Sequence, residues 1–135
     1  MITITEYIEL LLKDLSTRLP YGVICQVDDG LAGLNDGKLV EINISRELVR
    51  FDADYYWDAY IDDVKPYLRP LESMTEEESV EYYDTFEWEE DLNGGHYPNS
   101  MTYKTFEWLN AHHFDYRGLI EKGLAIAVTE ESSCN

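Results

Sequence analysis

The pair of residues with the best spacing for metal binding is His112 and Asp115. They are three positions apart near the end of a predicted helix, so both side chains would project from one face, as two metal ligands do. A closed site needs about four ligands, however, and His96 is the one histidine outside the His112-His113 pair. The helix dipole alone favours histidine at a helix C-terminus. We therefore expect no metal site here.

The segment Asp52-Ala-Asp-Tyr-Tyr-Trp-Asp58 has the spaced aspartates of a calcium-binding loop. Such a loop needs glycine at its sixth position, where the chain turns sharply, and an oxygen ligand at its fifth. Here the sixth residue is Trp57 and the fifth is Tyr56. The sequence therefore predicts neither a calcium site nor any other metal or cofactor.

The chain contains side chains that could catalyse a reaction, but it lacks the sequence motifs that normally accompany such residues in enzymes. Carboxylates are so abundant that no pair is informative, because acid-base catalysis needs two of them in one cleft with separated pKa values. Ser100, Cys25 and the histidines lack a Gly-x-Ser-x-Gly elbow, and Asp29-Gly-Leu-Ala-Gly33 lacks the Lys and Ser/Thr of a phosphate loop. We expect a non-enzymatic protein, with a metal-dependent enzyme using His112 and Asp115 as the most distant alternative.

Charge is the most informative property of this chain. Its 135 residues include 28 acids and 10 bases, which gives a formal net charge of −18. Fifteen of the acids but only two bases, Lys65 and Arg69, lie between Asp52 and Asp91. This acidity disfavours direct binding to nucleic acid, which depends on Lys and Arg. A basic protein surface is the partner that the region would attract.

Length and composition indicate one domain over residues 1–135, with a frayed tail at 130–135. No apolar run is long enough to span a membrane, and the N-terminus does not resemble a signal peptide. The two cysteines, Cys25 and Cys134, are expected to be free thiols in a reducing compartment. The sequence therefore predicts a cytoplasmic protein that does not contact membranes, and it leaves the oligomeric state open.

The hydrophobic pattern predicts the elements of the first half. Thr5 or Thr3 can cap an amphipathic helix that continues to about Leu15. Strands are expected at 23–27 and 38–44, with a further strand at 47–52. Asp28-Asp-Gly and Asn35-Asp-Gly are predicted as turns. The aromatic segment that follows has an ambiguous period.

In the second half, two prolines in residues 64–70 exclude a central strand and leave an edge strand or an extended crossing. A helix is predicted from Thr75 to Trp88, with a capping box formed by Ser73 and Glu76 or by Thr75 and Glu78. Residues 93–98 are predicted as a loop, and residues 101–112 as a helix with Phe106 and Leu109 facing inward. The expected fold is α+β, with a small antiparallel sheet of about three to four strands packed with about three helices.

Several segments stand out in chain order: Leu19-Pro-Tyr-Gly-Val23, Val64-Lys-Pro-Tyr-Leu-Arg-Pro-Leu71 with Ser73-Met-Thr-Glu-Glu-Glu78, and Trp108-Leu-Asn-Ala-His-His-Phe-Asp-Tyr-Arg-Gly-Leu-Ile-Glu-Lys-Gly-Leu-Ala125. These segments resemble small uncharacterised acidic proteins encoded by gut Bacteroidetes and by their phages or mobile elements. The group has no established activity. The resemblance therefore implies a mobile-element setting and supplies no catalytic residue.

Two hypotheses remain for the acidic region. In the first, its carboxylates imitate the phosphates of a nucleic acid and occupy the basic groove of a nucleic-acid-handling protein, such as a defence nuclease or CRISPR effector, with interleaved aromatics as anchors. In the second, the acids only solvate one face of a structural or adaptor protein whose contacts are apolar. The predicted partner-binding residues are Asp52, Asp54, Tyr56, Trp57, Asp58, Asp62, Asp63, Glu76, Glu77, Glu78, Glu81, Asp84 and Glu87.

Overall fold

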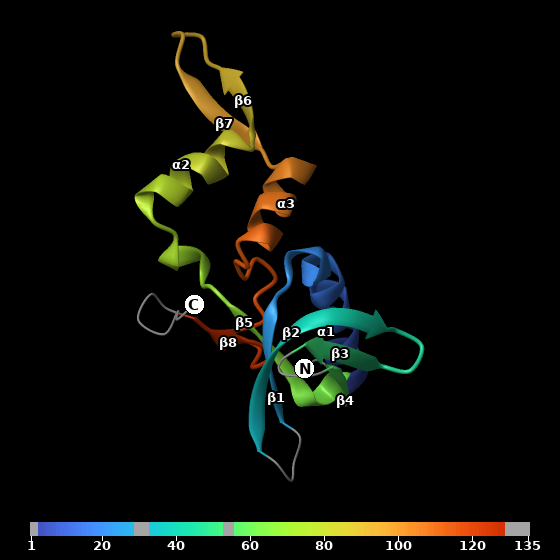
Figure 1. The fold of residues 1–135 in the computed structure, drawn as a ribbon. Coiled ribbons are helices and arrows are strands. Elements are labelled where there is room, and N and C mark those ends of the chain that lie inside the picture. Colours follow the sequence, from blue (N-terminus) through green and yellow to red (C-terminus); the bar gives the residue numbers. More distant parts are fainter. Residues whose placement is uncertain (1–2, 29–32, 53–55, 129–135) are drawn as a thin grey trace.

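The computed structural model describes residues 3–28, 33–52 and 56–128. Its largest element is a six-stranded sheet with the order β4-β3-β2-β1-β5-β8 (Figure 1). The strands are β1 (Ile24–Asp28), β2 (Leu34–Asn43), β3 (Leu48–Asp52), β4 (Tyr56–Tyr60), β5 (Val64–Leu68) and β8 (Ile126–Ala127). All neighbours are antiparallel except β5 and β8, which are parallel.

The predicted α+β class is confirmed, whereas the prediction of about three to four strands is wrong. One additional strand, β4, lies in the aromatic segment whose period was ambiguous. The other, β8, is two residues long and too short to show a period. It is held by β5, with Tyr67 opposite Ile126 and Leu68 opposite Ala127. Tertiary pairing, and not local pattern, makes these residues strands.

The N-terminal helix α1 (Ile4–Arg18) covers the sheet and begins at a capping box. The Thr3 hydroxyl accepts from the backbone N–H of Glu6, and the Glu6 carboxylate accepts from that of Thr3. Thr3 is therefore the cap, as one of the two predicted alternatives. The helix continues three residues beyond the predicted end at Leu15, to Arg18.

The hydrophobic core lies between α1, the sheet and the C-terminal segment. Its buried members are Leu11, Leu15, Val23, Cys25, Val27, Leu39, Val49, Phe51, Ile61, Val64, Leu68, Leu119 and Ala125. Cys25 is free, and its burial raises the pKa of the thiol, so the thiolate that would react does not form at neutral pH. The cysteine therefore acts as a core residue.

The predicted turn at Asn35-Asp-Gly is wrong, because these residues lie inside β2. The register of β1 and β2 starts at Asp28 opposite Leu34 and places Gly37 opposite Cys25. The other predicted turn, Asp28-Asp-Gly, lies outside the described residues after Asp28. Gly37 is buried, so it allows close packing beside Cys25 and forms no turn.

The prediction that prolines exclude residues 64–70 from a central strand is also wrong for β5, which lies between β1 and β8. β1 pairs with residues 64–66, and β8 pairs with residues 67–68. Each part of β5 therefore has a paired neighbour on one side only. Pro66 lies opposite Cys25 and needs no hydrogen bond toward β8, which is why the strand tolerates it.

Beyond the sheet, the chain forms α2 (Glu76–Asp84), β6 (Glu87–Glu90), β7 (His96–Ser100) and α3 (Tyr103–Ala111). The predicted helix 75–88 is correct at its start, where Thr75 and Glu78 form the capping box, and wrong at its end. The carbonyl oxygen of Thr85 accepts hydrogen bonds from the hydroxyls of Thr102 and Thr105 on the α3 side. These bonds fix the chain where α2 ends.

After this point residues 87–90 pair with residues 96–100 as an antiparallel hairpin, so the predicted loop at 93–98 is wrong for residues 96–98. We call residues 76–100, which contain α2 and the β6–β7 hairpin, the arm. All residues of β6 and β7 are exposed, and α2 has no buried residue. Figure 1 shows the hairpin at the end of the molecule that is farthest from β1. The arm therefore projects from the packed body.

The predicted third helix is confirmed as α3, with Leu109 buried as expected. The expectation that Phe106 faces inward is wrong, because the residue is 40% exposed, and its ring meets that of Tyr116 at a steep angle. The buried face of α3 consists of Thr105, Leu109 and Asn110. A polar face is buried because Thr105 is hydrogen-bonded to the end of α2.

His113 follows α3 in the left-handed backbone region, with φ 58°, and lies beside buried Arg18. Burial, followed by the charge of Arg18, lowers the pKa of His113 to about 4. The groups that act on it are Arg18, His112 and Asp14 together with the backbone of Tyr21. The folded protein therefore holds a neutral imidazole at pH values where the unfolded chain binds a proton.

We expect His113 to make folding stability depend on pH between about 6.5 and 4. Its contribution is complete above pH 6.5 and is lost as the pH falls through the folded value, because the unfolded chain is protonated first. His113→Asn removes the titration and keeps a residue that tolerates the left-handed backbone. Urea unfolding from pH 7 to 4 should show the wild type losing stability relative to this variant. A constant difference would contradict the expectation.

Candidate interaction surface

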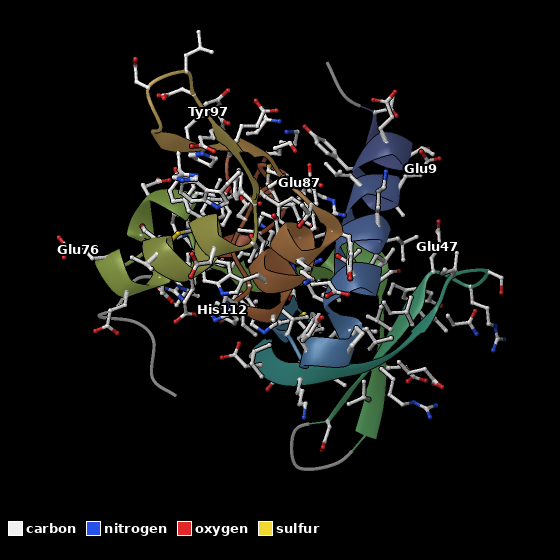
Figure 2. The ribbon with its side chains drawn as sticks, turned by 90° about the horizontal axis from the view of Figure 1, so that it is seen from above. Glu9, Glu47, Glu76, Glu87, Tyr97 and His112 are labelled. Atoms are coloured by element: carbon white, nitrogen blue, oxygen red, sulfur yellow. The ribbon has the colours of Figure 1, made fainter. Side chains whose placement is uncertain are left out.

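The structure divides the predicted partner-binding acids between two separate places. Glu76, Glu77, Glu78, Glu81, Asp84 and Glu87 lie on the arm or its connection, whereas Asp52, Asp58, Asp62 and Asp63 lie on β3, β4 and the turn after β4. Tyr56 and Trp57 lie in β4, and Asp54 lies outside the described residues. Figures 1 and 2 show α2 and β4 well apart. The single surface expected from sequence is therefore not formed.

The acids on the sheet are partly neutralised. Asp58 accepts a hydrogen bond from Arg50 at 2.9 Å, and this bond lowers the pKa of Asp58. Glu41 lies 3.6 Å from the same guanidinium. Slight desolvation and the neighbouring Asp62 raise the pKa of Asp63. This group is a weaker candidate for attracting a basic partner.

Between Arg69 and Lys104 the chain contains no Lys or Arg. The ten acids of this stretch are Glu72, Glu76, Glu77, Glu78, Glu81, Asp84, Glu87, Glu89, Glu90 and Asp91. All except half-buried Glu78 are exposed. In Figure 2, Glu76 on α2 extends away from the body, and Glu87 and Tyr97 mark the hairpin. The arm is therefore a surface of one sign, unlike the sheet.

Some acids of the arm hold the fold together and are not free for a partner. Glu78 accepts two hydrogen bonds from Arg69, both of 2.7 Å, and also caps α2. The Arg69 guanidinium in turn lies 4.2 Å from the centre of the Phe114 ring. Glu81 accepts from the indole N–H of Trp108. The predicted binding residues Glu78 and Glu81 therefore attach the arm to the body.

The Arg69 ion pair holds the pKa of the Glu78 carboxyl at about 2, chiefly through hydrogen bonding to Arg69. We expect Glu78→Gln, which can still cap the helix, to lower the free energy of unfolding at pH 7 by about 1–2 kcal/mol. The matched control Glu77→Gln, at an exposed neighbour, should change it by less than about 0.5 kcal/mol. Urea unfolding measures both.

The pH dependence of the unfolding free energy provides a second test of the pair formed by Arg69 and Glu78. Because the folded pKa of Glu78 is depressed, its contribution is present above about pH 4.5 and is lost as the pH falls toward 2. The difference between wild type and Glu78→Gln should therefore shrink over this range. Equal stability of the wild type and Glu78→Gln at pH 7 would show that the pair of Arg69 and Glu78 does not anchor the arm.

The hairpin itself is held by side-chain hydrogen bonds between its two strands and within its turn. Glu89 accepts from the Tyr97 hydroxyl at 2.8 Å and from the Asn99 amide at 2.7 Å. Asp91 accepts from the backbone N–H groups of Asn93 and Gly95 and so orders the turn. The arm therefore presents its charges from an ordered backbone, which lowers the entropy lost on binding.

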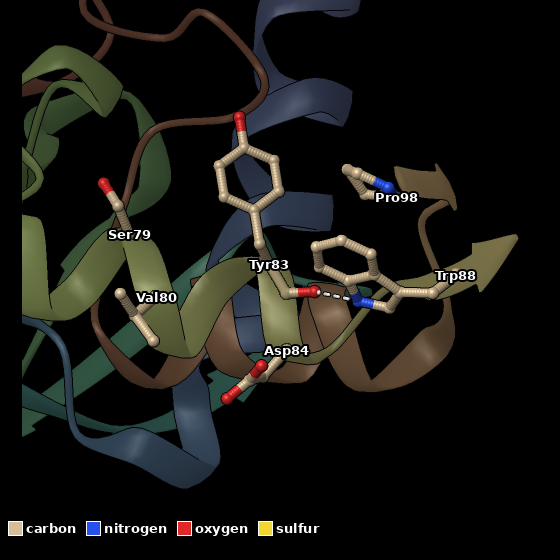
Figure 3. Close-up of a pocket in the computed structure, with 6 residues that line it drawn as sticks. All are labelled: Ser79, Val80, Tyr83, Asp84, Trp88 and Pro98. Atoms are coloured by element: carbon tan, nitrogen blue, oxygen red, sulfur yellow. Dashed lines mark hydrogen bonds between the residues drawn. The ribbon is translucent and has the colours of Figure 1, made fainter. Parts of the chain in front are cut away.

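Aromatic side chains join the arm to α3 and also reach its outer surface. Tyr82 packs on Phe86 and on Trp108, and Trp108 stacks on Phe114 of the body. On the outside, Tyr83 is 44% exposed and Trp88 is 45% exposed. They line a hollow of about 480 Å³ with Ser79, Val80, Asp84 and Pro98 (Figure 3).

This hollow was not predicted as a site, although Asp84 was predicted as a binding residue and Tyr83 and Trp88 were among the interleaved aromatics expected to act as anchors. Pro98 is opposite Trp88 in the hairpin register, and Val80 and Tyr83 are three positions apart on α2. The signal available in sequence was the helical spacing of Val80 and Tyr83 among acids. The contribution of β7 could not be foreseen, because residues 93–98 were predicted as a loop.

His112 and Asp115, the pair considered for metal binding, are each engaged in other contacts. His112 stacks on Trp108, and its Nδ1 lies 2.9 Å from the Trp108 carbonyl oxygen. Asp115 is buried, and its two carboxylate oxygens accept from the backbone N–H groups of Leu119 and Ile120. Within the described residues, no group of three or more His, Cys, Asp or Glu side chains could hold a metal ion. Both side chains have structural partners.

The described part of the chain contains no helix that combines the length and the apolar character needed to cross a membrane. No family model, curated protein or solved structure matches the chain. The chemistry of the arm is therefore the basis for a functional proposal.

Proposed function

We propose that this protein is a non-catalytic binding protein whose arm occupies a basic surface of another protein, in the place of a nucleic acid. The observation that carries the proposal is the arm itself, whose residues 76–100 include nine acids and no Lys or Arg and whose hairpin strands are exposed throughout. A basic partner would gain attraction along the whole arm. Opposite charge would also make association fast and sensitive to salt.

The partner class follows from this charge. Surfaces with a high density of Lys and Arg serve mainly to hold phosphate backbones, where duplex DNA places one charge about every 1.7 Å of its axis. An acidic arm that fits such a surface excludes the nucleic acid and so inhibits the protein that carries the surface. A nuclease or another nucleic-acid-handling protein, including a CRISPR effector, is therefore the proposed partner, and its inhibition is the proposed role.

The alternative is an adaptor whose acids only solvate the arm and whose contacts are apolar. The exposed side chains of Trp88, Leu92 and Tyr97 favour it, because apolar groups on a hairpin can be interface anchors. The two proposals differ in their dependence on salt. An apolar interface keeps its affinity when salt is raised, whereas one based on charge loses it.

Capture from a bacterial lysate on the immobilised protein separates the two. The mimic proposal expects a basic nucleic-acid-binding protein to be retained at about 50 mM salt, released at about 500 mM, and displaced by added duplex DNA. Retention of a partner that neither high salt nor duplex DNA displaces would overturn it and support the adaptor. Identification of the captured protein by mass spectrometry completes the test.

A further inference from the structure

The hollow on the outer side of the arm combines apolar walls with a carboxylate. Val80, Tyr83 and Asp84 come from α2, Trp88 from β6 and Pro98 from β7. Figure 3 shows the Tyr83 and Trp88 rings as neighbouring walls, with Pro98 beside the indole and Asp84 at the opposite side from the Tyr83 hydroxyl. The volume of about 480 Å³ lies within the range of small-ligand pockets.

The walls of this hollow are fixed in place. The indole N–H of Trp88 donates to the carbonyl oxygen of Tyr83 at 2.9 Å, which ties the ring to the end of α2. Tyr83 packs on Phe86, and their ring centres are 5.3 Å apart. Trp88 and Pro98 face each other across the hairpin. The hollow therefore needs little rearrangement to receive a side chain.

The charged group of the hollow, the exposed Asp84 carboxylate, is not paired within the described part of the protein. The Asp84 carboxylate forms no hydrogen bond or ion pair with another of the described residues, although several other acids of the arm do. No Lys or Arg of the chain lies between residues 69 and 104 to neutralise it. An occupant with a positive charge would therefore pair with Asp84 and also gain from the surrounding acids.

We infer that this hollow receives an arginine side chain of the basic partner. The aliphatic part of arginine suits Val80 and Pro98, the planar guanidinium can stack on the Tyr83 or Trp88 ring, and its N–H groups match the Asp84 carboxylate. An uncharged apolar side chain would leave the carboxylate unpaired. The inference rests on the proposed function and adds a specific anchor to an otherwise diffuse attraction.

A short blocked peptide, Gly-Arg-Gly, tests the hollow directly on the full chain by NMR titration. We expect saturable shifts of the Trp88 indole N–H and of the backbone amides of residues 79–88. The same peptide with citrulline, which keeps the shape and removes the charge, should bind at least about tenfold more weakly. Norleucine should also bind more weakly. Equal binding of the three peptides, or shifts located away from the hollow, would overturn the inference.

Matched variants separate the hollow from the general charge of the arm. Asp84→Asn should weaken the arginine peptide about tenfold, whereas Glu87→Gln, which removes the same charge outside the hollow, should have a smaller effect. Tyr83→Leu should weaken it, and Tyr103→Leu, at an exposed tyrosine of α3, should not. If a basic partner binds Asp84→Asn and Tyr83→Leu as tightly as wild type, the hollow is not the anchor and the proposed function still stands.

Discussion

Asp14→Ala is expected to lower the free energy of unfolding by about 3–5 kcal/mol, because it removes the anion from a buried charge network. The side chains of Asp14 and Arg18 are both fully buried, and Asp14 Oδ2 lies 2.9 Å from Arg18 Nε. Asp14 Oδ1 accepts from Arg117 at 2.8 Å. The network therefore joins α1 to the segment that follows α3.

The penalty is large because of what remains after the substitution. Arg18 would stay buried with a bond from Nη2 to the Phe114 carbonyl oxygen, but without a counter-ion. Its Nη1 already has no hydrogen-bond partner within the described residues. Thermal unfolding should show a midpoint lowered by about 10–20 °C. Glu9→Ala, at an exposed position of the same helix, should change stability by less than about 0.5 kcal/mol, and a loss below about 1 kcal/mol in Asp14→Ala would contradict the account.

Reversal of three arm charges, Asp84→Lys with Glu87→Lys and Glu90→Lys, is expected to weaken binding to the basic partner by about 100-fold or more. None of these carboxylates bonds to another described residue, so the change removes attraction and adds repulsion without breaking an anchor. Lysine near the C-terminal end of α2 is also favoured by the helix dipole. Glu78 and Glu81 are left unchanged, because their contacts hold the arm.

The matched control reverses three exposed acids away from the arm, with Glu9→Lys, Asp52→Lys and Asp62→Lys. It changes the net charge by the same amount, so it separates a local surface from overall charge. Titration calorimetry with the captured partner should give near wild-type affinity for the control, and urea unfolding should show both variants folded. Equal loss of affinity in the two variants would mean that only net charge matters.

The sequence predicted the parts of the fold that local chemistry specifies. Thr3 was one of two predicted caps for α1, and Thr75 with Glu78 was one of two predicted capping boxes for α2. Both starts could be predicted because a cap involves residues only three positions apart. The strands near 23–27 and 47–52 follow from alternation. What failed depends on partners distant in the chain, such as Thr85, where bonds from Thr102 and Thr105 end α2 before its helical pattern ends.

The sequence predicted which residue types would form the candidate surface, but not which of those residues would lie together on it. Acids interleaved with aromatics marked Asp84 and Glu87 for binding, and both lie on the arm. The sequence named Glu78 as a possible capping residue, but its ion pair with Arg69 could not be foreseen, because that contact depends on how the chain folds before α2. The separation of β4 from α2 is also a property of the topology. The β6–β7 hairpin, which completes the hollow, depends on pairing across residues 91–95.

Hydrogen exchange of the free and partner-bound protein tests the central claim most directly, because it locates the binding surface. α2 has no buried residue and both strands of the β6–β7 hairpin are exposed, so a partner seated on the arm should slow the exchange of their amides. We predict that protection on binding is concentrated in residues 76–100. Protection centred on β3, β4 and the turn that follows, with the arm unchanged, would contradict it.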